Sequence, residues 1–147
     1  MTLWDWVLIP WGRPRIRAGC LRLQDEHGQC VSLILWRAWA HAKRRPIDAA
    51  TINRAIALAR SWDEGVLRPL RTARRSVPQP AGDLPGLIEA VELEAERTLL
   101  DGLEVLTPQP ARSPPVESLD EALMAVVTAW GVQRPHVAEL AAELGAC

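Results

Sequence analysis

The stretch that decides the fold is residues 30–44, which reads CVSLILWRAWAHAKR. Its apolar side chains wrap nearly the whole circumference of a helix, and a helix that is apolar on most sides is a buried one. We therefore predict that this segment is the central helix of an all-α core. Lys43, Arg44 and Arg45 follow its end, where cations suit the negative end of the helix dipole.

Two shorter helices are predicted before this segment. Thr2 and Asp5 have the spacing of a capping box and begin the first helix, which we expect Pro10 to end. The second runs from Pro14 to about residue 26, with Gly28 as its stop. The side chains expected to face inward are Leu3, Trp6 and Val7, then Ile16, Cys20 and Leu23.

Further helices are predicted after the central one. Asp48 caps a helix, and Pro69 kinks or divides the next one. A Pro-containing loop at 76–82 leads into the longest helix, about 84–106. The side chains expected to face inward are Ile52, Ile56 and Ala59, then Trp62, Val66 and Leu70, and finally Ile88, Val91, Ala95, Leu99 and Leu103.

The chain divides into three parts by composition. Residues 1–106 are predicted to form an all-α core domain, a compact bundle of five or six helices. Residues 107–117 form a Pro-rich linker, with four prolines in the nine residues TPQPARSPP. Residues 118–147 are predicted to be a C-terminal amphipathic extension of two helices, tethered by that linker. Such short helices are stable only when docked, whether on their own domain, on a second copy or on a partner.

The features behind these last two helices are local. Ser118 and Glu121 form a capping box, Gly131 is a stop and Pro135 starts the final helix. The apolar stripe of that helix is Val137, Leu140 and Leu144.

Composition limits the class of protein. The chain has 147 residues, of which 48% are hydrophobic, and its net charge is −1, which excludes a wholly disordered or a strongly basic protein. No apolar run reaches the length of a membrane span, and MTLWDWVLIPW lacks the basic start and cleavage site of a signal peptide. Three cysteines, Cys20, Cys30 and Cys147, fit reduced thiols better than a disulfide framework. We expect a cytoplasmic protein without a membrane partner.

The charges are unevenly distributed along the chain. Residues 1–75 hold 14 basic and 6 acidic groups, whereas residues 76–147 hold 3 basic and 12 acidic groups. The two halves therefore carry +8 and −9. Because these values nearly cancel, we favour mutual neutralisation within one fold over an external anionic partner.

Three segments in order carry a resemblance to a known family. They are CLRLQDEHG at 20–28 followed by VSLILWRAW at 31–39, then WDEGVLRPLRTARR at 62–75, then ELEAER at 92–97. Over roughly residues 3–106 the chain resembles an uncharacterised family of small, cytosolic, all-helical proteobacterial proteins of unknown function. The resemblance implies an all-α domain and no established activity. Trp11 departs from the tyrosine expected there, and Cys30 from an acidic residue.

The densest polar run beside the core contains Gln24, Asp25 and His27. Asp25 and His27 could act as an acid–base pair at the mouth of a small-molecule pocket. The alternative, which we favour, is a polar network that closes a helix end at Gly28.

No metal or cofactor is expected. Cys20, His27, Cys30 and His41 lack the paired short spacings of a zinc site. The stripe of Glu89, Glu92 and Glu96 lacks the Glu-x-x-His motifs of a carboxylate metal bundle, and is more typical of a solvated or salt-bridged face.

Two groups of residues suggest binding surfaces. Arg68, Arg71 and Arg75, with Arg74 beside them, form a basic stripe that could bind RNA. We favour instead their pairing with the Glu89–Glu92–Glu96 stripe of the later helix, which the loop at 76–83 would bring back antiparallel. Trp4, Trp6 and Trp11 cannot all point inward from one short helix, so one or two of them line a groove or an interface.

No Gly-rich phosphate loop or nucleophile motif is present, so a non-enzymatic role is favoured over an enzyme. Our leading hypothesis is a protein-interaction or adaptor module, with a protein partner or self-association. The alternatives are an RNA- or ribosome-associated module using the arginine stripe, and a small-ligand binder or enzyme with a pocket near Asp25 and His27.

Overall fold

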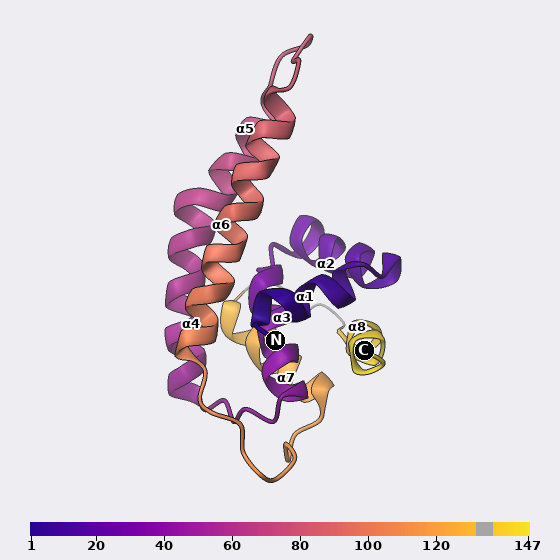
Figure 1. Cartoon of the computed structure of the whole chain (residues 1–147), viewed down its shortest axis with the longest axis vertical. Coiled ribbons are helices and arrows are strands. Elements are labelled where there is room, and N and C mark those ends of the chain that lie inside the picture. The colour runs from indigo at the N-terminus through magenta and orange to yellow at the C-terminus, as the bar shows by residue number, and fades with distance from the viewer. Residues whose placement is uncertain (132–136) are drawn as a thin grey trace.

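The computed structural model describes residues 1–131 and 137–147, and all regular structure in these ranges is helical, as predicted (Figure 1). The predicted start of the last helix at Pro135 lies outside the described residues. The helices are α1 (Leu3–Trp11), α2 (Pro14–His27), α3 (Val31–Ala42), α4 (Ala49–Trp62), α5 (Arg68–Ser76), α6 (Leu84–Leu106), α7 (Leu119–Trp130) and α8 (Ala138–Gly145), with a π-helical turn (Asp63–Leu67) between α4 and α5.

The centre of the molecule is α3, as its composition predicts. Nine of its 12 residues are buried, and helices from both ends of the chain pack around it. The indole Nε1 of Trp36 donates to Thr107 Oγ1 at 2.7 Å, and that hydroxyl donates to the Leu103 carbonyl at 2.7 Å. A buried polar group is thus satisfied, and the start of the Pro-rich segment is fixed to the core.

The first two helices follow their local signals, with one correction. The capping box of Thr2 and Asp5 is present, and Gly28 ends α2 in the left-handed conformation with φ 62°. The predicted end of α1 at Pro10 is wrong, because the helix continues to Trp11. The Gly12 N–H donates to the carbonyls of the preceding turn and closes the helix there. Pro10 lacks a backbone N–H, and the loss of its hydrogen bond is tolerated this close to the end of the helix.

The inward face of α4 is rotated from the prediction. Its buried side chains are Thr51, Ala55 and Ala59, whereas Ile52 and Ile56 are only half-buried. Helix α4 packs closely against α6 where a glycine of α6 meets a leucine of α4. A Cβ added at Gly102 of α6 would lie 3.0 Å from the Leu58 side chain.

Pro69 is accommodated by the π-helical turn that precedes α5. The Arg68 N–H donates to the Asp63 carbonyl five residues earlier, so the turn contains one extra residue. This insertion rotates the inward face, which is why Leu67 and Asp63 are buried while the expected stripe of Trp62, Val66 and Leu70 is only half-buried.

Helices α5 and α6 form an antiparallel hairpin that projects beyond the rest of the molecule (Figure 1). Ala95, Leu99 and Leu103 are buried as predicted. Val91 is not: it is exposed, and Glu92 is buried in its place. The reason is electrostatic, because Glu92 turns toward an arginine of α5.

The C-terminal helices dock on their own chain. The capping box of Ser118 and Glu121 is present, α7 packs on α3 and α4, and α8 packs on α2. Their buried side chains, including the predicted stripe of Val137, Leu140 and Leu144, share one hydrophobic cluster with residues of α1–α4 and α6. The Trp130 indole donates to the Gly28 carbonyl at 2.9 Å, which joins α7 to the end of α2.

Candidate functional site

A cleft of about 230 Å³ lies between α1 and α2 on one side and the α5–α6 hairpin on the other. Three leucines, one from each of three helices, line it and remain partly open to solvent. Leu8 is 50% exposed, Leu21 40% and Leu93 52%. Apolar side chains gathered around a hollow in this way are typical of a binding surface.

The N-terminal tryptophans separate into two groups. Trp4 and Trp11 line the cleft, whereas Trp6 is buried in the core. The Arg97 guanidinium lies 5.6 Å from the ring centre of Trp4 and so covers one indole with a cation. The cleft therefore combines two aromatic rings with leucine side chains.

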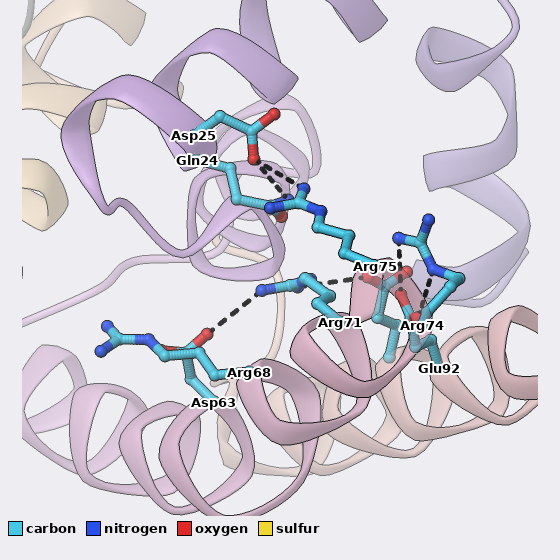
Figure 2. A network of polar contacts seen from close by, with 9 residues as sticks. Gln24, Asp25, Asp63, Arg68, Arg71, Arg74, Arg75 and Glu92 are labelled. Atoms are coloured by element: carbon cyan, nitrogen blue, oxygen red, sulfur yellow. Dashed lines mark hydrogen bonds and ion pairs between the residues drawn. The ribbon is translucent and has the colours of Figure 1, made fainter. Parts of the chain in front are cut away.

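One wall of the cleft is polar and consists mostly of paired charges, several of which Figure 2 shows. The Arg74 Nε donates to Glu92 Oε1 at 2.6 Å, and its Nη2 donates to Oε2 at 3.3 Å. This fork-shaped contact is a strong form of ion pair. The Glu92 side chain is only 8% exposed, and its hydrogen bond raises the pKa of Arg74 above the usual value.

Arg71 lies at the centre of this wall. Its Nη1 is 3.6 Å from Asp63 Oδ1, and its Nη2 is 3.5 Å from Glu96 Oε1. Both contacts are longer than typical hydrogen bonds, although the side chain is mostly buried. Burial also raises the pKa of the Glu96 carboxyl above its usual value.

The remaining arginines of the predicted stripe pair with aspartates. Arg68 Nε lies 2.6 Å from Asp63 Oδ2, and Arg75 Nη2 lies 3.2 Å from Asp25 Oδ1 (Figure 2). All four arginines are therefore engaged within the chain. The expected pairing with the glutamate stripe holds for Arg71 with Glu96, and the neighbouring Arg74 binds Glu92, while Glu89 lines the cleft.

A second, polar hollow of about 220 Å³ adjoins the cleft. Arg71 and Gln24 line both hollows, and Asp25 lines the polar one. His27 is not among the residues that line it, and its Nδ1 is buried without a hydrogen-bond partner among residues 1–131 and 137–147. Asp25 binds Arg75 instead, so the structure does not bring Asp25 and His27 together at a pocket.

The cysteines are free thiols, and two of them are unsuited to nucleophilic chemistry. Burial raises the pKa of Cys20 and of Cys30 to about 12, whereas only the thiolate is a nucleophile. Among residues 1–131 and 137–147, no group of three or more His, Cys, Asp or Glu side chains is placed to hold a metal ion. No helix in these ranges has the length and apolar character needed to cross a membrane.

Sequence reasoning missed three important members of the site. Asp63 binds Arg68 and Arg71, five and eight residues later, and neither spacing is the three or four residues at which side chains of a regular α-helix meet. Only the π-helical turn brings them together. Leu21 and Leu93 were also not singled out, because an isolated leucine on a helix carries no signal of exposure.

Residues 2–103 match a family described as proteins of unknown function, DUF2390. The chain belongs to this family. No curated protein and no solved structure matches it. The resemblance to a family of unknown function is thus confirmed.

The DUF2390 match includes every residue that lines the cleft and the polar hollow, since these lie between residues 4 and 100. It includes α1–α5 and most of α6 and ends before the Pro-rich segment, α7 and α8. The cleft therefore belongs to the part of the chain that the family shares. Its apolar lining and paired charges are suited to binding.

Proposed function

We propose that this DUF2390 protein is a non-enzymatic protein-interaction module, which holds an apolar segment of a partner protein in the cleft between α1–α2 and α5–α6. The observation that carries the proposal is the partial exposure of Leu8, Leu21 and Leu93 around one hollow, beside Trp4 and Trp11. Large aromatic and aliphatic side chains in a concave surface supply most of the energy of protein interfaces.

The size and charge of the cleft define the partner segment. At about 230 Å³ the cleft is smaller than the roughly 300–1,000 Å³ typical of drug-sized ligand pockets, and it suits one or two anchoring side chains. Its charged lining comprises Arg71 and Arg74 with Glu89, Glu92 and Glu96, an excess of one carboxylate. We infer an apolar partner segment with a neighbouring lysine or arginine that faces Glu89.

A peptide-display selection against the folded protein tests this proposal. We expect enrichment of peptides that combine large apolar side chains with a basic residue. Binding of a selected peptide should be lost in Leu93→Gln and retained in Leu87→Gln, because both leucines are exposed on α6 but only Leu93 lines the cleft. Equal binding by both variants, or selection of no apolar peptide, would refute the cleft as the binding site.

The alternatives rest on groups that already have partners. Arg68, Arg71, Arg74 and Arg75 all form internal ion pairs, which lessens the support for an RNA- or ribosome-associated role. Asp25 pairs with Arg75, which lessens the support for an enzyme or small-ligand binder at that position. Three free thiols support a cytoplasmic location for the proposed module.

A further inference from the structure

A larger cavity of about 690 Å³ lies between the C-terminal end of α3 and the Pro-rich segment 107–117. It shares no lining residue with the cleft or the polar hollow, so it is a separate feature. Its volume falls within the range of about 300–1,000 Å³ found for small-molecule sites. Pro46, Ile47 and Val116 contribute an apolar part of its wall.

Arg37 is the most unusual residue in the wall of this cavity. It lies in the middle of the buried central helix, and its side chain is only 1% exposed. Its Nη2 contacts Glu117 Oε1, but its Nε and Nη1 are buried with no hydrogen-bond partner in the described chain. A buried guanidinium with unfilled donors is costly, and burial lowers the pKa of Arg37 below its usual value.

Further nitrogen-bearing side chains surround the same cavity. His41 lies one turn after Arg37, and its Nε2 is 3.0 Å from the Glu117 carbonyl oxygen. The Arg45 guanidinium lies 4.8 Å from the ring centre of Trp39, and its Nε is also buried without an acceptor in the part of the chain that the structure describes. With Arg44, three guanidinium groups line the wall.

The opposing charges are two carboxylates, and one of them has another role. Glu121 accepts the Ser118 N–H at 2.7 Å and so completes the capping box of α7. Glu117 is the remaining carboxylate, and it is 42% exposed. Among the described residues, the counter-ion of Arg37 is therefore a glutamate that water can reach.

The Pro-rich wall is held in place by backbone contacts. The Ala111 N–H donates to the Arg44 carbonyl at 2.7 Å, and Arg45 Nη1 donates to the Pro108 carbonyl at 3.0 Å. These bonds position the wall over the end of α3.

We propose that this cavity binds a small organic oxyanion, a carboxylate or a phosphate on an apolar body, which takes the place of Glu117 on the Arg37 guanidinium. The guanidinium group matches both oxyanions in shape and charge. Arg44 completes the cationic part of the wall, His41 adds a ring nitrogen, and the prolines with Ile47 accept the apolar body. Glu117 acts as the internal counter-ion in the absence of ligand.

Isothermal titration at constant ionic strength tests the proposal with three probes that share an apolar ring. Phenyl phosphate and benzoate carry the two oxyanions, and benzyl alcohol is the neutral control. We expect an anion to bind and the alcohol not to bind, with the tighter anion identifying the head group. In Glu117→Gln, where the competing carboxylate is gone, the anion should bind about tenfold more tightly.

Two further variants separate ligand binding from structural effects. Glu143→Gln removes the carboxylate from the exposed pair with Arg15, so it should leave anion binding unchanged. The double variant His41→Gln/Arg44→Gln keeps Arg37 and the fold, which circular dichroism verifies, and should weaken binding at least about fivefold. Absence of anion binding, equal binding of the alcohol, or no gain in Glu117→Gln would overturn the proposal.

Discussion

Exchanging both members of the Arg74–Glu92 pair for methionine should change stability far less than exchanging either one alone. Breaking a fully buried ion pair costs about 3–5 kcal/mol, because the remaining charge is left without a partner. The two side chains are not equally buried: Arg74 is 30% exposed and Glu92 is 8% exposed. The cost should therefore depend on which charge remains.

In Glu92→Met the freed guanidinium is partly solvated, and we expect a loss of about 2 kcal/mol in the free energy of unfolding. In Arg74→Met the freed carboxylate of Glu92 is nearly buried, and we expect about 3–4 kcal/mol. The double variant places two apolar side chains together, and its cost should be about 1 kcal/mol or less, since apolar replacement of buried pairs is close to neutral.

Urea denaturation, followed by tryptophan fluorescence and by far-ultraviolet circular dichroism, measures all three values. The exposed Arg15–Glu143 pair supplies the matched control, for which each methionine variant should cost less than about 1 kcal/mol. If the two single costs add in the double variant, the pair makes no coupled contribution. If Glu92→Met costs more than Arg74→Met, the argument from unequal burial is wrong.

Three shorter predictions concern titration, backbone geometry and thiol access. Burial raises the pKa of Glu96 above its usual value of 4.5, so the folded protein binds a proton there more tightly than the unfolded chain does. The Glu96→Gln variant should therefore gain stability relative to the wild type as the pH rises above 4.5. A difference between their urea midpoints that does not change with pH would contradict this. Gly28→Ala should cost about 1–2 kcal/mol through its positive φ alone, whereas Gly86→Ala within α6 should stabilise by about 0.5 kcal/mol, as thermal unfolding can show. A thiol-specific reagent should label Cys147 rapidly in the native protein, and rapid labelling of the two buried cysteines would show that the core opens.

The features predicted correctly from the sequence are mostly local. Each of these features involves residues within one helical turn: the capping boxes at Thr2 and Ser118 and the stop at Gly28. A short stretch of sequence is therefore enough to predict them. The burial of residues 32–40 is also local in this sense, because a helix that is apolar on most sides is a buried one.

The errors arise where distant contacts change a local preference. On α6, Glu92 takes the buried position expected for Val91 because it turns to Arg74. On α4, Gly102 of α6 leaves room for Leu58, and Thr51 and Ala55 are buried instead of Ile52 and Ile56. The π-helical turn accommodates Pro69, which has no backbone N–H to donate. The spacing of apolar residues in the sequence does not reveal such a turn. The ion pair of Asp63 follows from that turn, so it could not be predicted without it.

Several ion pairs join the basic first half of the chain to the acidic second half. Arg74–Glu92, Arg71–Glu96, Arg37–Glu117 and Arg15–Glu143 each join the basic half of the chain to the acidic half. The other ion pairs in the described ranges lie within the basic half. The oppositely charged halves of the chain therefore attract each other at three places, namely the α5–α6 hairpin, the Pro-rich wall and the docked helix α8.

The cleft and the oxyanion cavity both lie where the two halves meet. The cleft has Arg71, Arg74 and Glu92 in its wall, and the cavity has Arg37 and Glu117. At such a boundary a charged ligand competes with an internal partner of opposite charge, so binding exchanges one ion pair for another. The net electrostatic gain of such an exchange is small, and selectivity then depends on the apolar surface beside the pair. The leucines of the cleft and the prolines of the cavity wall are the residues that provide this surface.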